Sequence, residues 1–151
     1  MRVRNALGFH VPLLLAMSLI SQAAPSQTTV TTLAQLRQGT RPLLIFAPGP
    51  DAAQMGIQLR ILNEHAAEAH DRQIVPIALP FQSPSPTAKT LSGDDAEAAR
   101  RHFHVAPGDF TVILIGKDGG AKLKSSKPIS MSKLNETIDA MPMRQDEMRK
   151  Q

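Results

Sequence analysis

Apolar residues in the first half of the chain first form a continuous run and then recur at a helical spacing. Leu43–Ala47 form an unbroken apolar run, which is typical of a strand with both faces buried. After it, apolar residues recur at spacings of four, three, four and three, namely Met55, Leu59, Leu62, Ala66 and Ala69. This spacing predicts one face of a single helix of about five turns. Asp51 precedes that helix and is a good residue to cap it.

A second strand is expected at Ile74–Leu79 (IVPIAL). Pro76 lies inside it and cannot donate a backbone hydrogen bond, so the strand should have an edge position or a bulge there. Residues 80–92 (PFQSPSPTAKTLS) are rich in proline and serine and indicate an irregular loop. A further helix, capped by Ser92 or Asp94, should follow and extend to about His102.

The second half of the chain predicts a hairpin followed by a helix. Phe110–Ile115 and Ala121–Lys124 flank Asp118-Gly119, a strong signal for a tight turn between two strands. Ser130 can cap a last helix whose apolar residues are spaced by three, four and three; these are Met131, Leu134, Ile138 and Met141. Pro142 interrupts this helix, and a charged tail follows.

This order of elements predicts an α/β domain with the thioredoxin-like fold. Strand–helix–strand requires a parallel pair, and helix–strand–strand–helix then adds an antiparallel hairpin. We expect one domain at 41–151, a four-stranded mixed sheet with helices on both faces. Residues 24–40 should be a flexible lead-in with a short helix ending at Gly39.

The first 23 residues resemble a signal peptide. Arg2 and Arg4 precede the short apolar run Val11–Ile20, and small residues at 21–24 permit cleavage after Ala23. The alternative is an uncleaved membrane anchor, although the apolar run is shorter than the roughly 20 residues that span a bilayer. We therefore expect an exported protein, periplasmic or extracellular, with no membrane association after cleavage.

Composition excludes several classes of function. The 151-residue chain has no cysteine, so it can neither form disulfides nor perform thiol chemistry. Its net charge of +4 is partly due to the signal: removing Arg2 and Arg4 from the seventeen basic residues leaves fifteen against thirteen acidic ones. With five Phe and no Trp or Tyr, the chain also has few aromatic side chains on which bases could stack, so we expect no nucleic-acid partner.

The candidate site lies where the first strand meets the long helix. Pro48, Gly49, Pro50 and Asp51 follow the carboxyl end of a buried parallel strand, a position that favours ligands. The neighbouring strand should bring Gly108, Asp109 and Phe110 to the same place. The prolines stiffen the loop and the glycines leave its backbone open, which favours a binding rim. Capping by Asp51 and a core position for Phe110 are the structural alternatives.

Other polar positions admit simpler explanations. Arg144 follows Met141-Pro142-Met143 and lies three residues before Glu147, which favours a tail packed on the domain; contact with a ligand is the alternative. Lys117, Lys122, Lys124 and Lys127 are typical of a protected sheet edge, or of a surface for an acidic partner. Gly116–Gly120 lacks the spacing of a phosphate loop. The pairs His65/His70 and His102/His104 lack the spacing of metal ligands, so we expect no metal.

Two stretches resemble thioredoxin itself. LLIFAPGPDAA is similar to the strand that leads into its Cys-x-x-Cys loop, and FHVAPGDFTVILIGKDGGAKL is similar to the later segment with the cis-proline. Here Pro48–Asp51 replaces the cysteines and Gly108–Phe110 replaces the proline. No redox residue carries over, so the chain should be neither a thiol–disulfide oxidoreductase nor a peroxidase.

A narrower resemblance covers 41–150. FTVILIGKDGGAKL together with IDAMPMRQDEMRK is similar to the bacterial exported family called domain of unknown function 4174, a related domain of which occurs in animal matrix-associated proteins. That resemblance implies a thioredoxin-like fold and an exported protein, and no activity or cofactor. We expect a non-catalytic module that binds an unknown protein or small ligand outside the cytoplasm. The alternative is a non-thiol enzyme using Asp51, Asp109 or Arg144.

Overall fold

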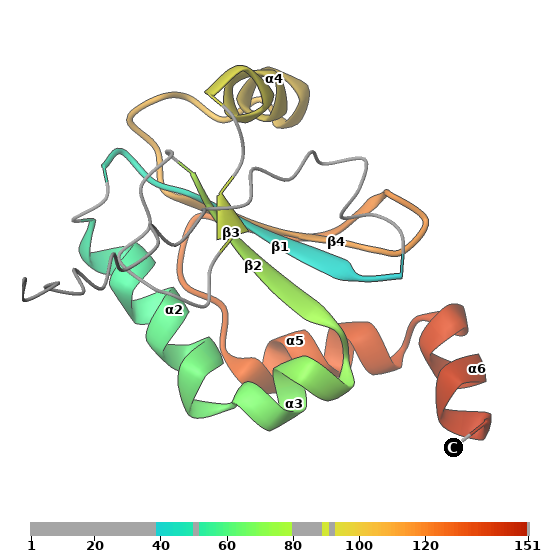
Figure 1. Ribbon diagram of the computed structural model, residues 1–151. Helices are drawn as coiled ribbons and strands as arrows, with labels where there is room; N and C mark the ends of the chain where they lie inside the picture. The colour runs from blue at the N-terminus through green and yellow to red at the C-terminus, as the bar shows by residue number, and fades with distance from the viewer. Residues whose placement is uncertain (1–38, 50–51, 80–88, 91–92, 151) are drawn as a thin grey trace, which may run out of the picture.

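The computed structural model describes residues 39–49, 52–79, 89–90 and 93–150, and places a five-stranded sheet at the centre of the domain (Figure 1). The strand order is β3-β2-β1-β4-β5. The strands are β1 (Arg41–Phe46), β2 (Ile74–Leu79), β3 (Lys89–Thr90), β4 (Thr111–Ile115) and β5 (Ala121–Ser125). β1 is parallel to β2 and antiparallel to β4, so the mixed sheet predicted from the order of elements is confirmed.

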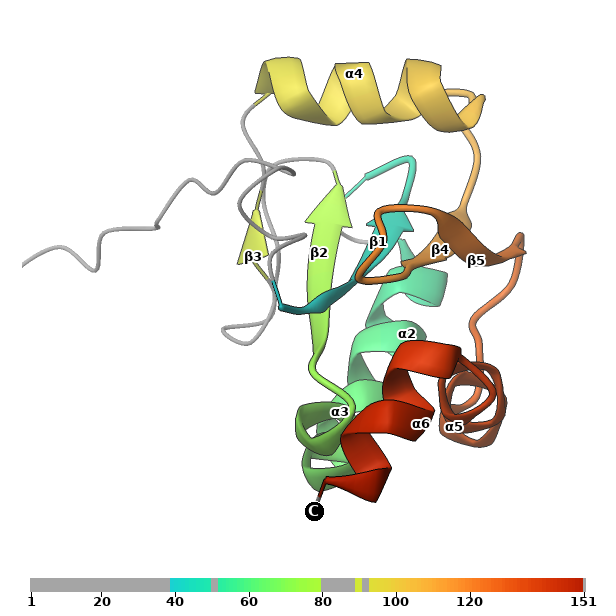
Figure 2. The same cartoon turned by 90° about the vertical axis from the view of Figure 1, so that its right-hand side faces the viewer.

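Helices cover both faces of this sheet. They are α2 (Ala53–Glu64), α3 (Ala66–Asp71), α4 (Gly93–Phe103), α5 (Met131–Asp139) and α6 (Pro142–Arg149). Of the described helices, α4 lies across one face, whereas α2, α3 and α5 lie on the other (Figures 1 and 2). α6 follows α5 and lies below the turn between β4 and β5.

The core is split by the sheet into two apolar clusters. Successive side chains of β1 point to opposite faces. Leu43 and Ile45 therefore pack with α2 and α5, while Leu44 and Phe46 pack with α4. All six residues of β1 are buried, as the unbroken apolar run predicts for a central strand.

The first half of the chain departs from the predictions in two places. The single helix expected after β1 is two helices, α2 and α3, which meet at His65, where φ is −116° and ψ is 36°. The apolar spacing continues across the junction from Leu62 to Ala69, so the pattern could not show the break. The segment expected to be an irregular loop contains the two-residue strand β3, which is too short to have a periodicity.

Pro76 fits this arrangement because β3 is so short. Among the described residues, β3 pairs with β2 at Ile77 and Ala78, and Pro76 lies outside that pairing. On its other side Pro76 is in register with Leu43 of β1. β2 therefore lies between β1 and β3 and not at the edge of the sheet, so the edge position or bulge expected from Pro76 is not found.

The second half agrees with its predictions and adds one helix. The hairpin turn at Gly116–Gly120 is present, and the Oγ of Ser130 accepts a 3.3 Å hydrogen bond from the backbone of Lys133 at the start of α5. Pro142 ends that helical run and occupies the first turn of α6. The charged tail is therefore a docked helix. The predicted signal and the lead-in up to residue 38 lie outside the described part of the chain, and Gly39, where the short helix was expected to end, has a φ of 84°.

Candidate functional site

The carboxyl end of β1 and the segment before β4 lie side by side, as the sequence predicts. Phe46, the last residue of β1, is in register with Thr111, the first residue of β4. Pro48 is exposed and Gly49 half-buried just beyond β1, and Gly108 and Asp109 are exposed just before β4. We call these four residues the rim.

Phe110 belongs to the core and not to the exposed rim. Its side chain is 7% exposed and packs in the cluster that contains α2 and α5. Its packing therefore fixes the segment before β4 to the core. Of the two roles considered for Phe110, the core position is the one observed. The backbone N–H of Asp109 donates to the carbonyl of Ala106 at 3.0 Å and closes a turn there.

Arg100 connects the two segments of the rim. It is on α4, is 8% exposed and lies over the ring of Phe46, 5.3 Å from the ring centroid. One guanidinium nitrogen donates to the carbonyl of Ala47 at 2.9 Å, and the other donates to the carbonyl of Ala106 at 3.3 Å. A single side chain thus holds both loops. Sequence reasoning missed it, although Arg100 lies four residues after the buried Ala96 and so on the same helix face.

Two other predicted site residues, Pro50 and Asp51, lie outside the described residues. The N-cap of α2 is Ala52, whose side chain makes no capping hydrogen bond. The expectation that Asp51 occupies this position is wrong by one residue, because the helix starts at Ala53.

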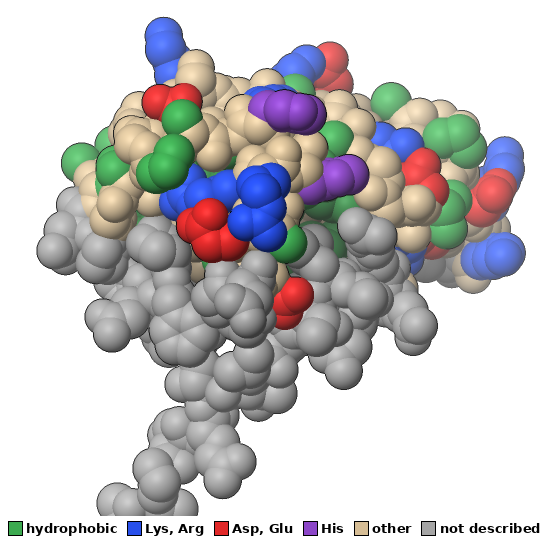
Figure 3. All heavy atoms as spheres, turned by 90° about the horizontal axis from the view of Figure 1, so that it is seen from above, with side chains coloured by type: hydrophobic (Ala, Val, Ile, Leu, Met, Phe, Trp, Pro, Cys, Tyr) green, Lys and Arg blue, Asp and Glu red, His purple; other side chains and the backbone are tan. Residues whose placement is uncertain are grey.

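The face that carries α4 shows no concentration of one charge. In Figure 3, which looks down on this side, basic, acidic and apolar side chains are interspersed wherever the structure describes them. A nucleic-acid surface would instead show a basic stripe. Of the hairpin lysines, Lys124 donates to the backbone carbonyl of Phe103 at 2.8 Å, and Lys122 pairs with Asp118 at 2.5 Å.

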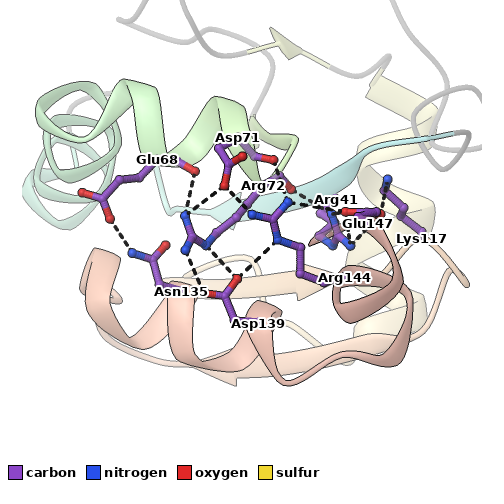
Figure 4. Close-up of polar contacts among 9 residues, drawn as sticks. All are labelled: Arg41, Glu68, Asp71, Arg72, Lys117, Asn135, Asp139, Arg144 and Glu147. Carbon is purple, nitrogen blue, oxygen red and sulfur yellow. Dashed lines mark hydrogen bonds and ion pairs between the residues drawn. The ribbon is translucent and has the colours of Figure 1, made fainter. Parts of the chain in front are cut away.

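Arg144, the last predicted site residue, lies at the opposite end of the sheet. It is 3% exposed on α6 and forms an ion pair with Asp71, whose backbone carbonyl it also contacts at 3.2 Å. It further contacts Asp139 at 3.4 Å. These contacts confirm that the tail packs on the domain (Figure 4). None of these partners of Arg144 belongs to the rim.

Arg144 is one member of a larger ion-pair cluster that the sequence did not show. Arg72, after α3, donates to both oxygens of Asp139 at 3.0 and 2.7 Å. These hydrogen bonds raise the pKa of Arg72 above its usual value. Burial alone would raise the pKa of Asp139, but Arg72 and Arg144 outweigh it, and the net pKa is lowered.

The other half of the cluster joins α6 to the sheet. The carboxylate of Glu147 contacts Arg41, the first residue of β1, at 3.1 Å and Lys117, in the hairpin turn, at 2.7 Å. Burial opposes ionisation of Glu147, but hydrogen bonds from Lys117 and Arg41 prevail and lower its pKa. Both carboxylates therefore remain ionised at neutral pH, which suits a structural role better than proton transfer.

A third carboxylate, Glu68, lies beside this cluster in Figure 4. Glu68 accepts a hydrogen bond from Asn135 and contacts the Nδ1 of His65 at 2.8 Å. Both contacts lower the pKa of Glu68, and the contact with His65 has the larger effect. Among the described residues no group of His, Asp and Glu has the arrangement of a metal site. Within that same part of the chain, no helix combines the length and apolarity needed to cross a bilayer.

Comparison with known families identifies the chain at the level of its family. Residues 32–147 match the family described as Domain of unknown function (DUF4174). The chain belongs to this family. The match spans the sheet and all the described helices, including most of α6, so the ion-pair cluster lies within the family's domain.

Two solved structures illustrate the fold that the chain shares. A reduced 2-Cys peroxiredoxin of Plasmodium vivax is 15% identical, with a TM-score of 0.58 over 76% of this chain and 84% of that chain. AhpC of Mycobacterium tuberculosis is 16% identical, with a TM-score of 0.52 over 74% of each chain. At these identities the likeness establishes the thioredoxin-like fold alone. The DUF4174 chain has no cysteine with which to share thiol chemistry.

Proposed function

We propose that this DUF4174 protein is an exported, non-catalytic binding module that takes a protein or small ligand at the rim. The observation that carries the proposal is the pair of hydrogen bonds from Arg100 to the carbonyls of Ala47 and Ala106. They hold two exposed loops in one fixed arrangement. A surface that is rigid before binding loses less conformational entropy when a partner binds.

The enzyme alternative has less support. Asp109 is the described carboxylate of the rim, and it is exposed. The carboxylates with lowered pKa at Asp139 and Glu147 are committed to ion pairs with arginine and lysine at the other end of the sheet. A general acid or base works best when its pKa lies near the operating pH, and these groups are shifted away from neutrality.

Export is supported by the charged start and the short apolar run of the first 23 residues. The test is the intact mass of the protein recovered from the exported fraction. Cleavage should remove about 23 residues, because the small residues at 21–24 meet the requirements of signal peptidase. Recovery of the full-length mass in that fraction would refute the proposal of a cleaved signal.

The rim itself can be tested with bulky substitutions at its glycines. No described atom lies within 4 Å of a Cβ built at Gly49 or Gly108, so Gly49→Trp and Gly108→Trp should fold with little loss of stability. Gln145→Trp, at an exposed position of α6 on the opposite end of the sheet, is the matched control. Urea denaturation would establish that all three variants fold.

Each variant would then be used to capture partners from the exported fraction. A partner bound by the original protein and by Gln145→Trp, but lost from both rim variants, is the expected result. If a captured partner remains bound to both rim variants, the rim is only scaffolding and the proposed site is wrong.

A further inference from the structure

A small pocket lies between the β4–β5 turn and the start of α6, at the end of β1 opposite the rim. Its volume is about 60 Å³. A cavity needs roughly 15 Å³ to hold one water molecule, so there is room for about four, the size of a small ionic head group. The lining residues come from three segments: Arg41, Gly116, Lys117, Asp118, Lys122, Met141, Pro142 and Met143.

The charges around this pocket leave one positive charge in excess. Arg41, Lys117 and Lys122 line it, and the opposing carboxylates are Asp118 in the lining and Glu147 behind it. The side chain of Arg41 is 1% exposed. Its Nε finds no hydrogen-bond acceptor within the described part of the chain. That atom is itself buried, so a ligand in the pocket cannot reach it directly, and the excess positive charge of the lining is what favours an anionic ligand.

The first turn of α6 adds further donors to the same pocket. Along this fully described eight-residue helix, the N-cap Met141 provides no side-chain cap and the first turn has no acidic residue. The first backbone hydrogen bond is donated by Gln145 to Met141, so the N–H groups of Met143 and Arg144 precede it. A helix start with free N–H groups attracts anions.

We infer that this pocket binds a small monocarboxylate with a short aliphatic chain. A single negative charge on the ligand balances the one excess positive charge of the pocket. The pocket is small, so only the head group of the ligand can enter it. Met141, Pro142 and Met143 provide an apolar wall beside it, and Met143 is 50% exposed, so the chain can extend along it towards solvent. This site is independent of the rim.

Butyrate is the probe, and methyl-labelled methionine is the reporter. Butyrate should shift the methyl signals of Met141 and Met143 in NMR spectra saturably, and leave those of Met55 and Met131, which are buried in the core, unchanged. Butyramide has the same chain without the charge and should not bind. Inorganic phosphate has the charge without the chain and should bind more weakly. Equal binding by butyramide or by phosphate, or the absence of a saturable shift, would overturn the inference.

Three substitutions on the hairpin distinguish the charge from the structure. Lys122→Gln removes a cation of the pocket and should weaken butyrate binding about fivefold, and Asp118→Asn removes an acid and should tighten it by a similar factor. Lys124→Gln is the matched control, because it removes the same charge two residues further along β5, outside the pocket lining, and should have no effect. The inference requires that Lys122→Gln weakens butyrate binding and that Asp118→Asn strengthens it. Equal effects of Lys122→Gln and Lys124→Gln would show that only the net charge of the protein matters and would refute the site.

Discussion

Glu147 lies against Arg41 although 106 residues separate them in the chain. Both terminal nitrogens of the Arg41 guanidinium donate to the Glu147 carboxylate, at 3.1 and 3.3 Å, and the ammonium of Lys117 reaches the same carboxylate at 2.7 Å. One acidic side chain of α6 thus forms ion pairs with cations from both β1 and the hairpin. Arg144 is the only residue of α6 that is fully buried, and Met143 and Met148 are exposed. The helix is therefore held to the sheet mainly by charge.

Glu147→Gln should destabilise the protein by about 2 kcal/mol, because it leaves Arg41 buried without its counter-charge. The estimate is below the cost of breaking a fully buried pair, since the Glu147 side chain is 25% exposed. Urea denaturation at neutral pH measures the free energy of unfolding. Glu136→Gln is the control: this side chain is 71% exposed in its pair with Lys133 and should cost less than about 0.5 kcal/mol. Equal losses for the two variants would mean that α6 is not held by Arg41.

Acid should destabilise the folded protein through the carboxylates that bind α6 to the rest of the domain. Burial alone would raise the pKa values of Glu147 and Asp139, but their hydrogen bonds to Lys117, Arg41, Arg72 and Arg144 lower both. A carboxyl group whose pKa is lowered by folding stabilises the folded state above its unfolded pKa, about 4 for these residues. That stabilisation is lost as the pH falls through the lowered pKa.

The measurement for this pH dependence is the free energy of unfolding between pH 6 and pH 3. It should be level near pH 6 and fall below about pH 4. Asp139→Asn removes one of the two groups, so its curve should start lower and decline less steeply. A decline of the same steepness in Asp139→Asn would show that other carboxyl groups cause the loss.

Reducing agent should leave the protein unchanged. The chain has no cysteine, so no disulfide contributes to its stability and no thiol can attack one. The melting temperature should be the same with and without dithiothreitol, and the protein should not accelerate insulin reduction. A shift of the melting temperature with reductant would indicate a bound redox group.

The sequence predicted the sheet because its signals are local. An unbroken apolar run such as Leu43–Ala47, the Asp118-Gly119 turn and the Ser130 cap each involve neighbouring residues, and the order of strands and helices then restricts the topology. β3 and the break at His65 were missed for the same reason. A two-residue strand has no periodicity, and the apolar spacing runs unchanged through His65.

The rim was only partly predictable, and the ion-pair cluster hardly at all. Gly49 and Gly108 could be placed together because antiparallel strands bring opposite ends into contact. The partners in the cluster are distant in the chain: 67 residues separate Arg72 from Asp139, and 73 separate Arg144 from Asp71. The sequence showed only that Arg144 and Glu147 share one helix face. The residues in the rest of the domain that they contact depend on how α6 packs against it, and no local sequence pattern specifies this packing.

Arg100→Met should loosen the rim while retaining the fold. The substitution keeps much of the apolar stem that packs on Phe46, but leaves the carbonyls of Ala47 and Ala106 without their donor. Loss of these hydrogen bonds should cost about 1–2 kcal/mol in the free energy of unfolding. Arg101→Met, at the exposed neighbouring position, should cost less than about 0.5 kcal/mol.

A local measurement separates loosening of the rim from a general loss of stability. The amide of Asp109 donates to the carbonyl of Ala106 at 3.0 Å, in the turn that Arg100 holds. Its hydrogen exchange should accelerate in Arg100→Met by more than that of Val112, a buried residue of β4, whereas Arg101→Met should affect neither. Acceleration at both amides by the same factor would mean that Arg100 stabilises the whole domain. The rim would then not be an independently ordered surface, and a fixed arrangement of its loops could no longer support a binding role.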